Sequence, residues 1–266
     1  MGAPLFQVDA FASGPFTGNP AAVCLLERPA DPAWMQAVAA EMNLSETAFV
    51  HAAGGESPGR FGLRWFTPTV EVDLCGHATL ATAHVLWNTN HLPAETAARF
   101  ETRSGVLIAS RSGDEVELDF PADPVSQAEP EPGLLDALGL AEVAVVSRGR
   151  VGWLLEVADA RAVRAARPDF SRLATFDSAV LTARADDAAY DFVSRFFGPK
   201  FGIDEDPVTG SSHCALGPYW ADRLGTTELT GFQVSARGGV VRVRVDGDRT
   251  MLGGRAVTVT RGELLL

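Results

Sequence analysis

Two short segments of the chain carry acid/base-capable side chains in similar surroundings. Residues 66–75 read FTPTVEVDLC and residues 197–206 read FGPKFGIDED, so both fit the pattern F-x-P-x-[VF]-x-[VI]-D-x-[CD]. Counting from the two phenylalanines, Cys75 and Asp206 fall at the same position of each copy. A turn containing glycine and an apolar, helix-like run follow each copy. The repeat predicts two similar halves that face each other, each presenting one such side chain to a cleft where protons are transferred.

Glu46 is a further acid/base candidate. It lies in the run Asn43–Thr47, where a predicted helix gives way to the apolar run Ala48–Val50. A carboxylate at the edge of a core is partly desolvated, and desolvation raises its pKa toward the range useful for a general acid or base. Taken alone, a solvated glutamate in a loop is the simpler interpretation.

The segment Asp73–His77 has the composition of a ligand-binding helix start. Gly76 lets the backbone approach a ligand closely, and His77 lies in the first turn of the helix expected to follow. Free N–H groups at a helix N-terminus bind carboxylates, and the same field lowers the pKa of a thiol, so Cys75 could be a thiolate base. The alternative is that Cys75 is a small core residue and His77 a capping donor.

The segment Asp204–His213 places three consecutive carboxylates before a helix start that contains Gly210 and Ser211. This order resembles an anion-receiving turn with a carboxylate at its edge. Consecutive acids point in different directions and no partner ligands follow at a standard spacing, so no metal site is expected. The alternative is an acidic loop with a helix cap. Asn19, in the turn Phe16–Pro20, could supply further donors or could be a plain helix cap.

Composition excludes several classes of function. The formal net charge of −12 argues against nucleic-acid binding, which needs a basic face. The sequence contains neither G-x-G-x-x-G nor a P-loop, and Lys200 is its only lysine, so a nucleotide is not expected and Schiff-base chemistry could rest on that lysine alone. Three cysteines without a C-x-x-C pair form no zinc knuckle or dithiol motif. We therefore expect no cofactor and no metal, and reduced thiols in a cytoplasmic protein that lacks a signal peptide and a membrane span.

The expected elements give an α+β arrangement in duplicate, with a first half of residues 1–122 and a second half of residues 123–266. The predicted helices, after cap signals or in apolar runs, cover residues 21–26, 32–42, 76–87, 134–138, 159–166 and 210–224. The predicted strands cover residues 5–11, 46–52, 60–66, three runs within 98–120, 143–147, 153–157, 179–183, 190–197 and a strand-rich tail from residue 227. Each half thus has many strands and one apolar central helix.

Four ordered elements of the sequence resemble one known family. They are VDAF-x4-FTGNPAAV, NLSETAF, F-x-P-x3-VDLCGHATLA and DEDPVTGSSHCAL, and they extend from about residue 5 to residue 224. Together they are similar to the phenazine-biosynthesis PhzF-like family, which has the diaminopimelate-epimerase-like fold. The resemblance implies two similar halves, each a barrel-like, mostly antiparallel sheet around a central helix, with the active site between them. It also implies a possible homodimer.

The resemblance further implies a cofactor-independent isomerase that moves a proton and a double bond in a small carboxylate-bearing substrate. The family's isomerase acts on a dihydro-hydroxyanthranilate with a single glutamate as acid/base, and the matching residue here is Glu46. The substrate-binding residues expected from the resemblance and from the turns described above are Asn19, Ser45, Cys75, Gly76, His77, Asp206, Gly210 and Ser211.

Two other functions remain open at the level of sequence. Related epimerases use one cysteine from each half as a pair of bases, so Cys75 and Asp206 could act on opposite faces of a stereocentre. Only one of these positions is a cysteine here, which argues against a matched thiol pair. The other alternative is a non-catalytic member of the family that binds a small molecule. Neither a nucleic-acid nor a membrane partner is expected.

Overall fold

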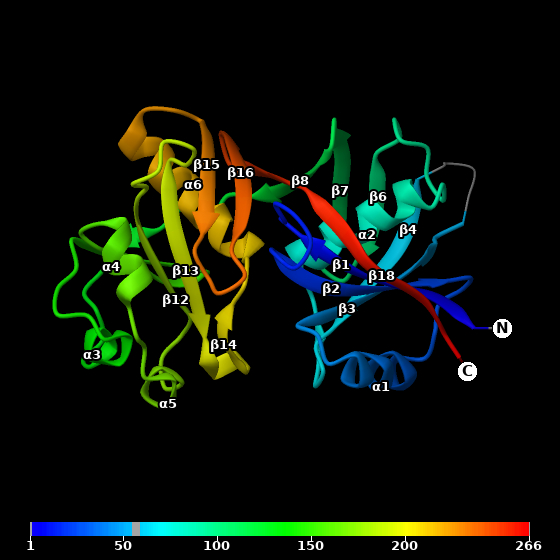
Figure 1. Cartoon of the computed structure of the whole chain (residues 1–266), viewed down its shortest axis with the longest axis horizontal. Helices are drawn as coiled ribbons and strands as arrows, with labels where there is room; N and C mark the ends of the chain where they lie inside the picture. Colours follow the sequence, from blue (N-terminus) through cyan, green and yellow to red (C-terminus); the bar gives the residue numbers. More distant parts are fainter. Residues whose placement is uncertain (1, 55–58, 266) are drawn as a thin grey trace. The chain divides into compact units, whose positions relative to one another are not determined.

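The computed structural model describes residues 2–54 and 59–265 and divides into two compact units (Figure 1). Unit 1 comprises Met1–Asp119 together with Gly253–Leu266, and unit 2 comprises Phe120–Leu252. The sequence-based division assigned the whole C-terminal segment to the second half, and the structure differs there. The last strand, β18 (Ala256–Leu264), belongs to unit 1 because it pairs antiparallel along β1 (Ala3–Ala10).

Unit 1 is a mostly antiparallel sheet around one apolar helix. Helix α2 (Gly76–Asn88) is buried along most of its length and contacts β1, β2, β3, β7 and β18. A helix that is apolar nearly all round needs such enclosure. The pairs β1–β2, β3–β4, β4–β5, β6–β7 and β7–β8 are antiparallel, whereas β2–β3 and β4–β6 are parallel. The remaining elements are β2 (Asn19–Leu26), α1 (Pro32–Met42), β3 (Glu46–Ala52), β4 (Arg60–Phe66), β5 (Glu71–Val72), β6 (Ala98–Thr102), β7 (Gly105–Ser112) and β8 (Glu115–Pro121).

Unit 2 repeats this order of pairings around helix α6 (Gly210–Leu224). The pairs β10–β11, β12–β13, β13–β14 and β15–β16 are antiparallel, and β11–β12 and β13–β15 are parallel. The duplicated α+β fold predicted from the sequence is therefore confirmed. The other elements are β9 (Ser126–Gln127), α3 (Leu134–Leu138), β10 (Val145–Gly149), β11 (Gly152–Glu156), α4 (Ala160–Ala165), α5 (Phe170–Leu173), β12 (Ala179–Arg184), β13 (Phe192–Gly198), η1 (Pro199–Phe201), β14 (Ile203–Asp206), β15 (Glu228–Gln233), β16 (Gly239–Asp246) and β17 (Arg249–Gly254).

One predicted helix is wrong. Residues 21–26, expected to be helical after Asn19 and Pro20, form most of strand β2. This strand pairs with β1 on one side and β3 on the other, and nearly all of its side chains are buried. A short apolar run fits a buried strand as well as a helix, and pairing on both sides overrides the local cap signal. Asn19 is thus the first residue of a strand.

The two central helices begin in matching ways, and their alignment corrects the mirror pair inferred from the sequence. The N-cap of α2 is Cys75 and the N-cap of α6 is Thr209, both extended, with φ/ψ of −146°/112° and −112°/106°. A glycine follows each cap as the first helical residue. Thr209, and not Asp206, is therefore the counterpart of Cys75. The short helix η1 accounts for the difference, because it lengthens the second copy between its phenylalanine and its helix.

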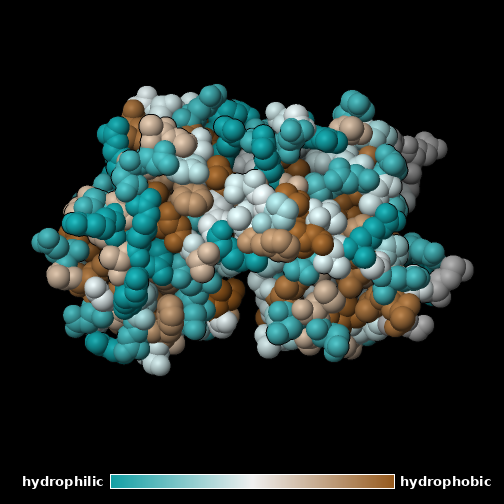
Figure 2. Space-filling view, in the orientation of Figure 1, coloured by the Kyte–Doolittle hydropathy of each residue, from teal (hydrophilic) through white to brown (hydrophobic). Residues whose placement is uncertain are grey.

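The surface carries both hydrophilic and apolar residues. On the face shown in Figure 2, hydrophilic residues predominate over both units, with apolar residues scattered between them. Across the described parts of the chain, no helix combines the length and the apolar character needed to cross a membrane.

Candidate active site

The strand order of unit 1 brings three separate segments together at the start of α2. Glu46 is the first residue of β3, which runs parallel to β2 with Ala21 opposite Glu46. Asn19 begins β2, so it lies beside the turn that enters β3. Cys75 is the N-cap of α2, and His77 is the second residue of that helix. The expected residues Asn19, Ser45, Glu46, Cys75 and His77 therefore lie in one cluster.

His77 lies at the centre of this cluster. Its Nε2 is 3.2 Å from Glu46 Oε2 and 3.2 Å from Ser45 Oγ. Its Nδ1 is 3.3 Å from Asn19 Nδ2 and 3.5 Å from Cys75 Sγ. Exposed fractions are 0% for Asn19, 5% for His77, 6% for Cys75 and 9% for Glu46. The cluster is thus a compact, nearly dry polar group.

Burial and pairing act in opposite directions on the pKa of Glu46. Burial would raise it, but the charge of His77 and close polar contacts with His77, Ser45 and Cys75 outweigh burial and lower the pKa below its ordinary value of 4.5. The raised carboxyl pKa expected from the sequence is therefore wrong, because that expectation considered desolvation without the histidine. Glu46 is a carboxylate at neutral pH.

The pKa of His77 moves the other way. Burial would lower it, but the polar contact with Cys75 and the negative charge of Glu46 raise it well above the ordinary value of 6.5. The pair is accordingly an imidazolium beside a carboxylate. A charged histidine in a buried site is a strong stabiliser of negative charge on a bound molecule.

Cys75 differs from the expectation of a thiolate base. Burial and the neighbouring charge of Glu46 raise the pKa of its thiol, while His77 acts to lower it and does not prevail. Cys75 is therefore a protonated thiol in the unliganded site.

One carboxylate oxygen of Glu46 accepts no hydrogen bond from the described residues. Oε2 is buried and makes an ion pair with His77 Nε2, yet that contact lacks hydrogen-bond geometry, and the oxygen has no hydrogen-bond partner among the described residues. A buried carboxylate oxygen without a hydrogen bond is costly to maintain. Such an atom can accept a proton from a bound molecule.

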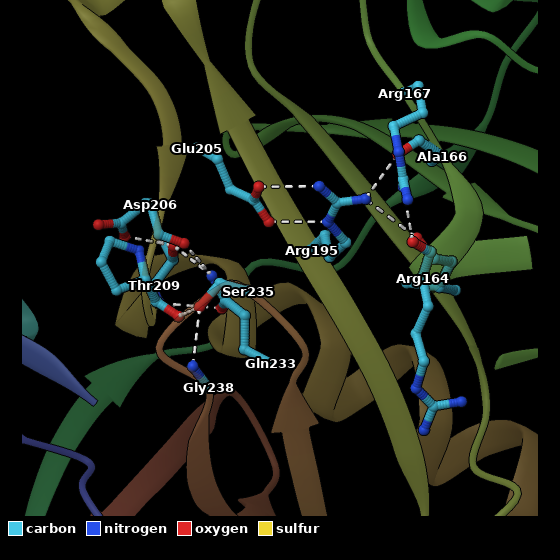
Figure 3. Close-up of polar contacts among 12 residues, drawn as sticks. Arg164, Ala166, Arg167, Arg195, Glu205, Asp206, Thr209, Gln233, Ser235 and Gly238 are labelled. Atoms are coloured by element: carbon cyan, nitrogen blue, oxygen red, sulfur yellow. Dashed lines mark hydrogen bonds and ion pairs between the residues drawn. The ribbon is translucent and has the colours of Figure 1, made fainter. Parts of the chain in front are cut away.

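The second group of candidate residues surrounds the N-terminus of α6 in unit 2 (Figure 3). Thr209 Oγ1 donates a hydrogen bond to Asp206 Oδ2. The fully buried Gln233 joins both residues, because its Oε1 accepts from Thr209 N at 2.9 Å and its Nε2 donates to the carbonyl oxygen of Asp206 at 2.7 Å. These two hydrogen bonds of Gln233, called the Gln233 clamp below, hold the loop between β14 and α6 in place.

The first turn of α6 carries the other expected residues. Gly210 is the first helical residue and is buried, and Ser211, the second, is exposed. His213 Nδ1 lies 2.8 Å from the carbonyl oxygen of Thr209, and burial lowers the pKa of His213 to about 4. His213 is therefore neutral and donates this hydrogen bond.

Sequence reasoning did not identify Gln233 or His213 as part of this arrangement. Gln233 ends a strand far along the chain from Thr209, and no local pattern indicates which loop a buried glutamine contacts. Sequence spacing likewise gave no metal-ligand set, whereas the fold brings one atom each of Glu46, Cys75 and His77 within 4.8 Å of one another. The mixture of oxygen, sulfur and nitrogen donors is one that a soft divalent cation accepts.

Comparisons with known proteins agree on one family. The profile described as "Phenazine biosynthesis-like protein" matches residues 8–262. An uncharacterized isomerase of Halalkalibacterium halodurans is 47% identical, with 100% of both chains covered. The crystal structure of a PhzF-family phenazine biosynthesis protein from Enterococcus faecalis is 42% identical, covers 100% of both chains and superposes with a TM-score of 0.93.

A more distant structure shares the fold. The hydroxyproline epimerase of Agrobacterium vitis is 13% identical, with a TM-score of 0.64 over 98% of this chain and 92% of that chain. At this identity the likeness concerns the arrangement of strands and helices alone.

Proposed function

Because the chain belongs to the phenazine biosynthesis-like protein family, we propose that it is an isomerase in which Glu46 moves a proton within a small carboxylate-bearing substrate. The relative from Halalkalibacterium halodurans is named an isomerase. The observation that carries the proposal is the buried Glu46 carboxylate, paired with His77 and retaining an oxygen without a hydrogen bond.

Internal comparison of the two units supports a single base. Glu46 precedes Thr47, which lies opposite Phe66, and the matching residue of unit 2 is Ser178, which precedes Ala179 opposite Phe197. Cys75 caps α2, and Thr209 caps α6. Neither serine nor threonine acts as a base near neutral pH without a neighbouring base, so the acid/base residues of unit 1 are not duplicated at these positions. One carboxylate that removes a proton and returns it elsewhere suits this asymmetry.

In the proposed reaction, the Glu46 carboxylate removes a proton from a carbon next to a conjugated or carboxylate-activated centre. The resulting negative charge spreads over the conjugated system, and the imidazolium of His77 stabilises it. The protonated Glu46 then returns the proton to another carbon, so the double bond shifts and the carboxylate is restored. The scheme is balanced without a cofactor.

The remaining site residues are proposed to bind the substrate. The backbone N–H groups at Gly76 and Gly210, each at the start of a helix, suit a substrate carboxylate. Asn19, Ser45 and Cys75 in unit 1, and Asp206 and Ser211 in unit 2, would supply the other polar contacts. The expectation that both halves contact one substrate stays a prediction.

A two-base racemase is the second candidate. It needs a second base, and the raised pKa of the Cys75 thiol disfavours that role. Binding without turnover is the third candidate, and the retained Glu46–His77 pair argues against it.

The test is a screen of small cyclic unsaturated carboxylic acids, including a dihydro-hydroxyanthranilate, incubated with the enzyme in D2O and followed by NMR. We expect at least one compound to show a shifted double bond, with deuterium entering at the reprotonated carbon. Inversion of a stereocentre without a double-bond shift would indicate the racemase. Saturable binding without change in any compound would indicate a binding protein.

A further inference from the structure

The site of unit 1 also has the composition of a metal site. Glu46, Cys75 and His77 each offer one ligand atom, and these three atoms lie within 4.8 Å of one another. All three side chains are buried. Within residues 2–54 and 59–265, no second group of three His, Cys, Asp or Glu side chains meets the same criterion. The cluster is therefore distinct from the acidic groups expected on the surface of an acidic protein.

The three donor atoms lie within 4.8 Å of one another, a spacing somewhat wider than that around zinc. Four-coordinate zinc has bonds of about 2.0–2.3 Å, which places its donor atoms roughly 3.3–3.8 Å apart. His77 Nε2 is 3.2 Å from Glu46 Oε2, and His77 Nδ1 is 3.5 Å from Cys75 Sγ. Because one ring nitrogen must serve the metal, one of the other two donors has to move by about 1 Å. Rotation of a single side chain provides such a movement.

The surroundings of the three donors favour a soft ion. Cys75 and His77 are fixed by the first turn of α2, and Glu46 by the start of β3. Magnesium and calcium prefer oxygen ligands throughout, whereas zinc accepts sulfur, nitrogen and oxygen together. Ser45 Oγ lies 3.2 Å from His77 Nε2, where it can accept the N–H of that nitrogen when Nδ1 binds the ion.

We propose that this cluster binds a soft divalent cation such as Zn²⁺, and that the bound ion holds the enzyme inactive by coordinating the Glu46 carboxylate. The ion displaces one proton from the His77 imidazolium and one from the Cys75 thiol into solvent, and the three protein ligands leave a fourth position for water. The carboxylate then cannot reach a substrate carbon, since its free oxygen is bound to the metal. The inhibition rests on the proposed function, whereas the binding does not.

The test uses the reduced, full-length protein without an affinity tag, in oxygen-free buffer, titrated with Co²⁺. A thiolate ligand gives Co²⁺ a charge-transfer absorption in the near ultraviolet, so the spectrum reports the Cys75 ligand directly. We expect one equivalent of Co²⁺ to saturate this band and Zn²⁺ to abolish it by displacement. Cys75→Ser should lose the band, whereas Cys214→Ser, which alters a buried thiol of unit 2, should retain it.

Two further variants check the other ligands. Glu46→Gln and His77→Gln should weaken Zn²⁺ binding by more than the ~10–100-fold that loss of a supporting partner typically costs. Co²⁺ binding without a charge-transfer band would overturn the proposal, because it would place the ion on surface carboxylates. A band that persists in Cys75→Ser would also overturn it, since another thiol would then be the ligand.

The inhibition has its own readout. Once a substrate is known, saturating Zn²⁺ should abolish turnover and a chelator should restore it, whereas Mg²⁺ should have no effect. Turnover that continues at saturating Zn²⁺ would refute the inhibition and leave the proposed isomerase intact. Failure to find any substrate would count against the isomerase and leave the Co²⁺ spectrum as evidence for the metal site.

Discussion

At the scale of single residues, the Glu46–His77 pair determines the protonation state of the candidate site. The two groups are buried together and shift each other's pKa in opposite directions, so both are charged near neutral pH. A buried pair of this kind is seldom a net source of stability compared with an apolar pair of the same size. Its presence therefore suits a functional role, with the carboxylate as base and the imidazolium as the stabiliser of negative charge.

The opposite pKa shifts predict how the pair contributes to stability. His77 has a folded-state pKa above 6.5, so its contribution is full below that pH and is lost as the pH rises through the folded-state value. Glu46 has a folded-state pKa below 4.5, so its contribution is full above that pH and is lost as the pH falls through the folded-state value. The pair therefore contributes most to stability between pH 4.5 and pH 6.5, the ordinary pKa values of its two groups.

The variant His77→Gln tests this predicted pH dependence of stability. Removing one partner of a buried pair typically costs about 3–5 kcal/mol, and a tenfold change in proton affinity corresponds to about 1.4 kcal/mol. We expect the difference in unfolding free energy between wild type and His77→Gln to be largest near pH 6 and to shrink as the pH is raised. Urea unfolding of both proteins across this range measures it. A difference that stays constant or grows at alkaline pH would contradict the assigned charges.

Cys75→Ala separates the single-base and two-base mechanisms. The thiol is protonated and serves as a neighbour of Glu46 and His77, so we expect kcat/KM to fall by no more than about tenfold. Loss of a positioned general base costs on the order of 10²–10⁴-fold. The kcat/KM of Cys75→Ala, measured on the substrate identified by NMR, decides between the single-base and two-base mechanisms. A loss of about 10²-fold or more would favour the two-base racemase.

At the scale of elements, the loop before α6 is held from both sides. Gln233 clamps the backbone of Asp206 and Thr209, and His213 and Ser212 both donate to the carbonyl oxygen of Thr209. Every polar group of Thr209 is therefore engaged in a defined bond. Such bonding fixes the position of the helix N-terminus that is proposed to receive the substrate carboxylate.

Gln233→Leu should release this clamp. The variant keeps the volume of the side chain but leaves the buried N–H of Thr209 and the carbonyl of Asp206 without this partner, at about 1–3 kcal/mol for each group. We expect a loss of roughly 2–6 kcal/mol in urea unfolding and a raised KM. Ser235→Ala is the matched control, because Ser235 donates to Pro207 in the same loop from a half-buried position.

Gln233→Glu refines the test. It keeps an acceptor for Thr209 N but turns a buried carboxyl toward the carbonyl oxygen of Asp206, so it should be less stable than wild type and lose further stability as the pH rises and the carboxyl ionises. If Gln233→Leu is no less stable than Ser235→Ala and has an unchanged KM, the glutamine does not position the loop.

At the scale of the whole molecule, unit 1 depends on a strand from the far end of the chain. Strand β18 pairs with β1 from Ala3 opposite Leu264 to Ala10 opposite Ala256. A chain that ends at Leu252 lacks this strand and exposes the edge of β1. Each lost backbone hydrogen bond costs about 0.5–1.5 kcal/mol net, and the sum over a whole strand is comparable with the 5–15 kcal/mol that stabilises a typical domain.

We therefore expect truncation after Leu252 to unfold unit 1, whereas truncation after Leu264 leaves the melting curve unchanged. Hydrogen exchange followed by mass spectrometry, peptide by peptide, would show the loss of protection in β1, β2 and β3. Full protection of these strands in the shorter chain would mean that unit 1 does not need its C-terminal strand.

The sequence supported the duplicated fold well, because each half carries its own periodic strands and an apolar helix. It failed where partners are distant along the chain. Residues 21–26 are a strand because of their neighbours on both sides, and the C-terminal tail belongs to unit 1 because of β1. The mirror pair of Cys75 was misplaced by three residues because the short helix η1 cannot be inferred from the shared pattern.

The candidate site was predictable as a set of residues but not as a set of charges. Family motifs pointed to Glu46, His77 and their neighbours, and the structure groups those of unit 1 around His77. The direction of the pKa shift of Glu46 depended on a histidine 31 residues away in the sequence. Only the folded chain shows that this histidine faces the carboxylate.

The central claim is that Glu46 alone carries the proton, and turnover by Glu46→Gln tests it most directly. The amide keeps the shape of the side chain but cannot exchange a proton near neutral pH. Folding is checked by circular dichroism and thermal melting, and turnover of the NMR-identified substrate is then compared with wild type. We expect a loss of at least ~10²–10⁴-fold with the native fold retained. Turnover near the wild-type rate in a folded Glu46→Gln protein would contradict the account and move the chemistry to Cys75 and Asp206.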